Sequence, residues 1–105
     1  MQFGLSIERY NRMKAVFSNL NAIEEVIVFG SRALGTFRPN SDIDFALKGE
    51  NICYNDILKL YRLFDELPYG YTYDILDYKT ITNPELIAHI DNFGLSFYKK
   101  KGDVS

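Results

Sequence analysis

Short runs of β-branched and aromatic residues alternate with amphipathic segments along this chain, and the alternation limits its possible folds more than any other feature. Residues 26–29, VIVF, are the clearest run, and because Gly30 follows them they predict a buried strand that ends there. Residues 42–47, 71–78 and 95–98 predict three more strands. We therefore expect an α+β fold, an α/β arrangement in two layers in which helices cover a small sheet.

Three amphipathic helices are predicted around these strands. The first begins at Ile7, after the capping residue Ser6, and its apolar residues recur at helical spacing as far as Leu20. The second has its apolar face between Ile57 and Leu67. The signals that bound the second and third helices are Pro68, Gly70, Asn83, Pro84 and Gly94.

The connection between the first two strands is short. Only residues 31–41 separate them, which is near the shortest length that a parallel crossover allows. We therefore expect these strands to pair antiparallel and the sheet to be mixed. The length of 105 residues predicts one domain, residues 1–105.

Composition favours a cytoplasmic protein. A formal net charge of -2 argues against the broad basic surface that binds duplex nucleic acid. Cys53 is the single cysteine, so it forms no internal disulfide, and we expect it to be buried in a protein of a reducing compartment. No stretch approaches the ~18 apolar residues of a membrane span, and the N-terminus lacks the pattern of a signal peptide.

Two aspartates, Asp42 and Asp44, lie one residue apart at the predicted second strand. Alternation along a strand puts both on one face, where two carboxylates repel unless a cation binds them. Carboxylate oxygens on a rigid strand suit Mg²⁺. The alternative is a charged strand edge that prevents aggregation.

The preceding loop favours the metal site. Gly30 permits a sharp turn and close approach to a ligand, and the amides of the helical turn predicted after it can face an anion. Ser31 adds a hydroxyl, and Arg32 and Arg38 add positive charge. The loop is therefore a candidate phosphate-binding site, although it lacks the P-loop and Rossmann patterns.

A third carboxylate is sought in the predicted third strand, which contains Asp74 and Asp77. Asp74 lies between apolar residues in the strand interior, where an unpaired acid is costly, and we favour it as the third metal ligand. Asp77 lies nearer the strand end, where we expect an exposed acid. Because they are three residues apart, the two should face opposite ways.

The pattern of these residues resembles the DNA polymerase β-like nucleotidyltransferase superfamily. It consists of Gly30 and Ser31, a spacing of ten residues to Asp42 and Asp44, and a later strand with an aspartate between apolar residues. The segment GSRALGTFRPNSDIDFAL is similar to the minimal nucleotidyltransferases within it. This resemblance covers nearly the whole chain. It implies that Gly30 and Ser31 hold the β- and γ-phosphates of a nucleoside triphosphate, and that Asp42 and Asp44 hold two Mg²⁺ ions.

The resemblance also implies a reaction and a partner. Asp74 would help to activate a hydroxyl that attacks the α-phosphorus and expels pyrophosphate. Small members are commonly antitoxins paired with a helical HEPN-domain toxin, a ribonuclease, and some transfer AMP from ATP to a toxin tyrosine. The chain departs from the family at Leu34, often a basic residue, and at Asn40, often Asp.

One interpretation without catalysis remains open. The domain could be a binding module that neutralises a partner by contact through its aromatic residues, among them Tyr69, Tyr71, Tyr73 and Phe97. His89 has no second histidine or cysteine nearby, so we expect a surface or packing histidine. The sequence leaves open the acceptor, the nucleotide preference and whether the protein forms homo- or hetero-oligomers.

Overall fold

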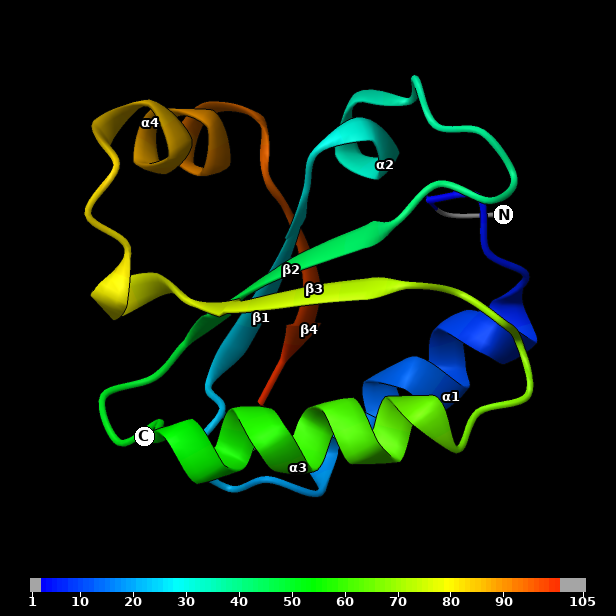
Figure 1. Ribbon diagram of the computed structural model, residues 1–105, viewed down its shortest axis with the longest axis horizontal. Coiled ribbons are helices and arrows are strands. Elements are labelled where there is room, and N and C mark those ends of the chain that lie inside the picture. The colour runs from blue at the N-terminus through cyan, green and yellow to red at the C-terminus, as the bar shows by residue number, and fades with distance from the viewer. Residues whose placement is uncertain (1–2, 101–105) are drawn as a thin grey trace.

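The computed structural model describes residues 3–100, and in this part of the chain four strands form one sheet (Figure 1). The elements in chain order are α1 (Ile7–Ser18), β1 (Glu25–Phe29), α2 (Ser31–Leu34), β2 (Ile43–Lys48), α3 (Tyr54–Asp65), β3 (Tyr73–Asp77), the 3-10 turn η1 (Tyr78–Thr80), α4 (Pro84–Phe93) and β4 (Leu95–Lys99). The strands lie in the order β3-β2-β1-β4.

The sheet is mixed, as the short first connection predicted. β1 pairs antiparallel with β2 and with β4, whereas β2 and β3 are parallel. The connection between the two parallel strands contains α3 and is long enough for a crossover. The predicted strands and helices are all present, and their ends differ from the predicted ones by a few residues.

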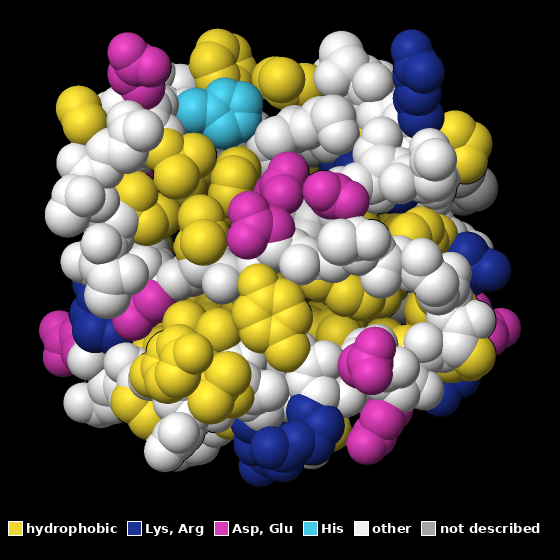
Figure 2. All heavy atoms as spheres, viewed as in Figure 1, with side chains coloured by type: hydrophobic (Ala, Val, Ile, Leu, Met, Phe, Trp, Pro, Cys, Tyr) yellow, Lys and Arg dark blue, Asp and Glu magenta, His cyan; other side chains and the backbone are white. Residues whose placement is uncertain are grey.

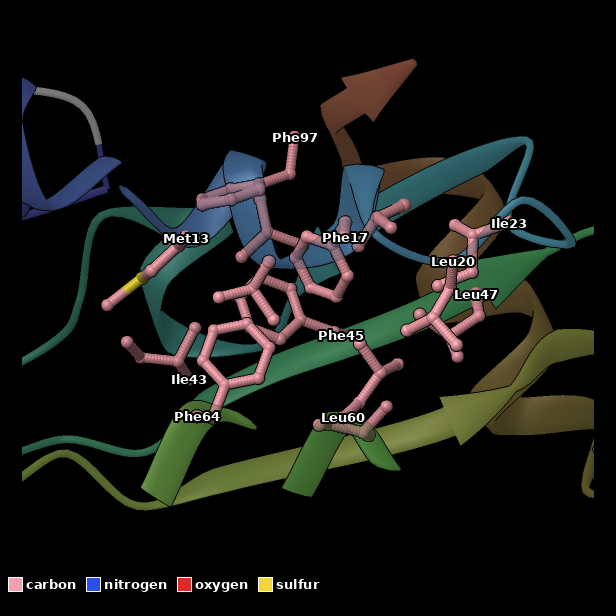
Figure 3. Close-up of a cluster of buried hydrophobic side chains, with 14 of the residues drawn as sticks. Met13, Phe17, Leu20, Ile23, Ile43, Phe45, Leu47, Leu60, Phe64 and Phe97 are labelled. Atoms are coloured by element: carbon pink, nitrogen blue, oxygen red, sulfur yellow. The ribbon is translucent and has the colours of Figure 1, made fainter. Parts of the chain in front are cut away.

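The main hydrophobic core lies between the sheet and the helices α1 and α3 (Figure 3). Ser6 caps α1 as predicted, by accepting a hydrogen bond from the backbone N–H of Arg9. Phe17 of α1 lies edge-on to Phe45 of β2, with ring centroids 4.9 Å apart, and 5.1 Å from Phe64 of α3. All three rings are buried. This cluster ties both helices to the sheet and supplies the larger share of the apolar burial.

The opposite face of the sheet carries α4 and the short α2 (Figure 1). Ile90 of α4 is buried against Ile27 and Phe29 of β1. Asn83 caps α4 through its side chain, as predicted, and the helix ends at Gly94. This smaller contact fixes α4 over β1 and leaves the β3 side of the face open to water, where Asp74 is exposed.

The predicted environment of Cys53 is wrong. Cys53 is exposed at the start of α3, where its backbone N–H donates to the Asp56 carboxylate at 3.0 Å. Cys53 is the capping residue of α3 and exchanges hydrogen bonds with the first turn of that helix, so it lies at the helix end and not in the core. Across residues 3–100, none of the helices is long and apolar enough to cross a membrane.

Candidate active site

The two aspartates of the D-x-D pattern lie where β2 begins. Asp44 is the second residue of β2 and is half-buried, whereas Asp42 is exposed and directly precedes the strand. The predicted strand start is therefore wrong by one residue, since pairing with β3 begins at Ile43. Ile43 and Phe45 point into the main core, so Asp44 between them points to the face that carries α4.

Asp74 lies beside Asp44 on the neighbouring strand. β2 and β3 are parallel, and their register pairs Asp44 with Asp74. Paired residues of adjacent strands, which are about 4.8 Å apart, point to the same face, so these two carboxylates lie close together. Asp74 is exposed, so the expectation that it is buried is wrong. Its pairing with Asp44, and not the cost of burying an acid, makes it the third candidate ligand.

Asp42, Asp44 and Asp74, here called the acidic group, interact electrostatically. Burial, then the charges of Asp74 and Asp42, raise the pKa of Asp44. Figure 2, which views the molecule from the β3 side, shows acidic side chains gathered at the middle of the visible surface. Like charges this close are unfavourable unless a proton or a cation binds between them, and Mg²⁺ suits such oxygen ligands.

The acidic group is not a closed cage of ligands. Within residues 3–100, no set of three or more His, Cys, Asp and Glu side chains is placed so that it could hold a metal ion. Mg²⁺ is commonly bound by one or two carboxylates together with substrate phosphates and water. The donor set therefore fits a metal that arrives with a phosphorylated substrate.

Asp77 is buried, unlike the exposed Asp74. Its side chain is 7% exposed, so the expectation of an exposed acid is wrong. It accepts a hydrogen bond from the Lys79 backbone N–H and pairs with the Lys79 ammonium group at 2.6 Å. The two aspartates face opposite ways, as predicted, because they are three residues apart on a strand. Asp77 therefore holds the turn η1 and lies away from the acidic group.

The turn after β1 packs directly on Asp44. Gly30 has φ +74°, a left-handed conformation that glycine adopts at little cost. A Cβ atom at Gly30 would overlap the Asp44 carboxylate, so no other residue type fits there without displacement. Ser31 then begins α2, as predicted. The backbone of this turn therefore lies against the acidic group.

The Arg32 side chain is in a different place from the one predicted. It is 2% exposed, and its guanidinium group donates hydrogen bonds of 2.8, 3.4 and 3.0 Å to three backbone carbonyl oxygens, those of Phe3, Pro39 and Ser41. The side chain thus ties the loop before Asp42 to the N-terminal segment. The role of Arg32 in nucleotide binding stays a prediction.

His89 makes a contact that the sequence did not indicate. Its Nε2 accepts a hydrogen bond from the Gly30 backbone N–H at 3.0 Å. The imidazole lies edge-on to Phe29, with ring centroids 6.1 Å apart, and Figure 2 shows the histidine on the same face as the acidic side chains. Gly30 and His89 are 59 residues apart, and only the packing of α4 on β1 brings them together.

A glycine turn packed against carboxylates on neighbouring strands is the arrangement expected of a nucleotidyltransferase. The model of the polymerase beta nucleotidyltransferase family matches residues 11–103, which include the turn and the whole acidic group. The chain belongs to this family. It is therefore a nucleotidyltransferase domain with the small mixed sheet of that fold. A comparison with curated proteins gives no match.

Solved structures with the same fold include a chain of a toxin–antitoxin structure with AMP-PNP, at TM-score 0.69 and 19% identity, covering 88% of this chain and 74% of that one. A chain from the complex of tri-AMPylated Shewanella oneidensis HEPN toxin with MNT antitoxin gives 0.63 and 17%, covering 89% and 71%. A putative nucleotidyltransferase from Sulfolobus solfataricus gives 0.51 and 24%, covering 95% and 90%. At these identities the likeness establishes the fold.

Proposed function

We propose that this protein is a Mg²⁺-dependent nucleotidyltransferase that moves a nucleoside monophosphate, AMP from ATP, onto a hydroxyl group. The convergence of Asp42, Asp44 and Asp74 beside the Gly30 turn carries the proposal. Nucleotidyl transfer needs metal-binding carboxylates and a backbone that approaches phosphates closely. Membership of the polymerase beta nucleotidyltransferase family supports it independently.

Each residue has a task in this reaction. Asp42, Asp44 and Asp74 would hold Mg²⁺, two ions in all, which would stabilise the charge that develops on the transferred phosphate and on pyrophosphate. Gly30 and Ser31 would present the turn to the β- and γ-phosphates. Asp74 is the exposed member on β3, where an incoming hydroxyl can reach it. It would accept the hydroxyl proton as the oxygen bonds to the α-phosphorus and the bond to pyrophosphate breaks.

We further propose that the acceptor is a tyrosine of a HEPN-domain toxin, so that the protein acts as a cytoplasmic antitoxin in a hetero-oligomer. The fold is shared with chains of a toxin–antitoxin structure that contains AMP-PNP and of a complex with an AMPylated HEPN toxin. AMP-PNP is an analogue of ATP, which supports ATP as the donor. Neither a membrane nor nucleic acid is a direct partner in this proposal.

Transfer of labelled AMP tests the proposed function. The protein is incubated with Mg²⁺, with ATP labelled on its α-phosphate and with a co-expressed HEPN partner. We expect label on a partner tyrosine, located by mass spectrometry, and none when EDTA removes Mg²⁺. The absence of label on the partner and on every other acceptor would overturn the proposal.

A second candidate is neutralisation of the partner by contact alone. Three large side chains recur at helical spacing along α3 and are exposed, namely Tyr54, Leu58 and Tyr61. The aromatic residues that the sequence suggested for this role are less available. Phe97 is buried, and Tyr69, Tyr71 and Tyr73 pack against the main core.

The double variant Asp42→Ala with Asp44→Ala separates the two candidates. Both changes lie on the acidic group and leave α3 untouched. If transfer is the mechanism, the variant still forms the complex but no longer protects cells from the toxin. Protection that survives the double change would show that contact is sufficient.

A further inference from the structure

α4 contributes one polar contact to the site. The Gly30 backbone N–H donates to Nε2 of His89 at 3.0 Å. A ring nitrogen accepts a hydrogen bond through its lone pair, so Nε2 is the acceptor in this contact. The contact therefore joins the turn after β1 to a helix that supplies no member of the acidic group.

Gly30 is packed tightly against the acidic group. Its backbone fills the space beside the Asp44 carboxylate so closely that even a Cβ atom would overlap it. Ser31 follows directly and begins α2. A displacement of Gly30 therefore moves the turn and also changes the distance from the turn to Asp44.

His89 is itself held firmly. The next residue, Ile90, is buried against β1 and anchors α4. The imidazole ring has two aromatic neighbours, with centroid distances of 6.1 Å to Phe29 and 5.6 Å to Phe93. A side chain restrained by its helix and by ring contacts has little conformational freedom to lose, so it serves as a fixed point for the turn.

We propose that His89 is a positioning residue of the nucleotidyl-transfer site, which holds the Gly30 turn in register with Asp44 through the hydrogen bond to Nε2. The inference rests on the proposed function and adds a residue to its machinery. Displacement of reacting groups by about 1 Å costs about 100-fold in rate, so loss of this contact should lower kcat by roughly 10- to 100-fold. The nucleotide KM should change less than kcat, because the triphosphate keeps its metal ligands.

Three variants separate positioning from packing. His89→Phe retains an aromatic ring beside Phe29 but removes the acceptor. His89→Gln replaces the ring and restores an acceptor oxygen. Asn92→Ala is the matched control, because Asn92 is exposed on the same helix.

Four measurements are made on each protein: hydrogen exchange of the Gly30 amide by NMR, binding of Mg²⁺ with a non-hydrolysable ATP analogue by calorimetry, AMP transfer kinetics, and the melting temperature. For His89→Phe we expect faster exchange at Gly30 and the loss in kcat, with a melting temperature close to that of the unchanged protein. His89→Gln should recover most of both, and Asn92→Ala should resemble the unchanged protein.

Unchanged kcat and Gly30 exchange in His89→Phe would overturn the inference, as would a His89→Gln variant that recovers neither. These outcomes leave the proposed function standing, because the unchanged protein would still transfer AMP. If the unchanged protein neither binds the nucleotide analogue nor transfers AMP, the proposed function fails and the inference fails with it.

Discussion

The two faces of the sheet divide stability and chemistry between them. Among residues 3–100, sixteen buried residues form one cluster under α1 and α3, whereas the cluster under α4 has four. The acidic group, the Gly30 turn and His89 belong to the second face. β2 serves both faces because its side chains alternate, with Phe45 in the core and Asp44 in the site.

This difference shows how a small domain can tolerate a cluster of like charges. Apolar burial on one face supplies the free energy of folding, so the other face can keep carboxylates near water and near one another. If this division holds, substitutions on the core face should change stability, and substitutions on the site face should change transfer. Four predictions test it, beginning with the largest expected effect.

Phe17→Ala should remove about 3–5 kcal/mol from the free energy of unfolding, because the ring meets β2 and α3 at the centre of the core. The control is Phe93→Ala on the site face, where the side chain is 53% exposed and the loss should be small. Urea denaturation measures both. Equal losses would contradict the division between the faces.

Asp74→Asn and Asp77→Asn should have opposite effects, although the two residues share one strand. Asp74→Asn should lower AMP transfer by about 100- to 1000-fold, as expected for loss of a group that stabilises transition-state charge, and leave stability nearly unchanged. Asp77→Asn weakens the ion pair with Lys79 and should cost about 1–3 kcal/mol of stability while transfer persists. Kinetics and denaturation are measured on both; lost transfer in Asp77→Asn alone would reverse the assignment.

Leu60→Ala and Ile90→Ala compare the two clusters with side chains of equal size. Both residues are buried, Leu60 in the main core and Ile90 under α4. Such changes cost about 2–5 kcal/mol, and we expect Leu60→Ala near the upper end and Ile90→Ala near the lower. Ile90→Ala should also slow transfer, because α4 carries His89. A greater loss of stability in Ile90→Ala than in Leu60→Ala would show that the cluster under α4 contributes more to stability than the main core does.

Asp44→Asn should stabilise the metal-free protein at neutral pH. Because the folded-state pKa of Asp44 is raised above its ordinary value of 3.8, the folded protein holds this proton more tightly than the unfolded chain does. That contribution to stability is fully present below the ordinary pKa and is lost as the pH rises through the raised pKa. An asparagine does not ionise, so it avoids the loss.

The test is the melting temperature of both proteins in EDTA across about pH 3 to 8, because Asp ordinarily titrates near the lower end of this range. Asp44→Asn should melt higher at neutral pH, and the difference should shrink toward the acid end. Added Mg²⁺ should stabilise the unchanged protein more than the variant. A variant that melts lower at neutral pH in EDTA would contradict the repulsion within the acidic group.

Local patterns were sufficient for the elements of the fold. The caps at Ser6 and Asn83 and the helix end at Gly94 all occur as predicted. The antiparallel pairing of β1 with β2 follows from the few residues between them. Caps, periodicity and connection length act over a few neighbouring residues, so the sequence displays them directly. The glycine turn and the spacing to Asp42 and Asp44 were readable for the same reason.

The environment of each charged side chain was decided by the tertiary structure. Asp74 is exposed and Asp77 is buried, the reverse of what we expected, because exposure depends on which face of β3 meets the core and which remains open. The sequence predicts that Arg32 binds phosphate, but its guanidinium group donates to carbonyl oxygens of segments that only the folded chain brings near it. The sequence by itself determined the strands, the helices and the residue types of the site. Only packing decided that His89 meets Gly30, because this contact joins residues 59 positions apart.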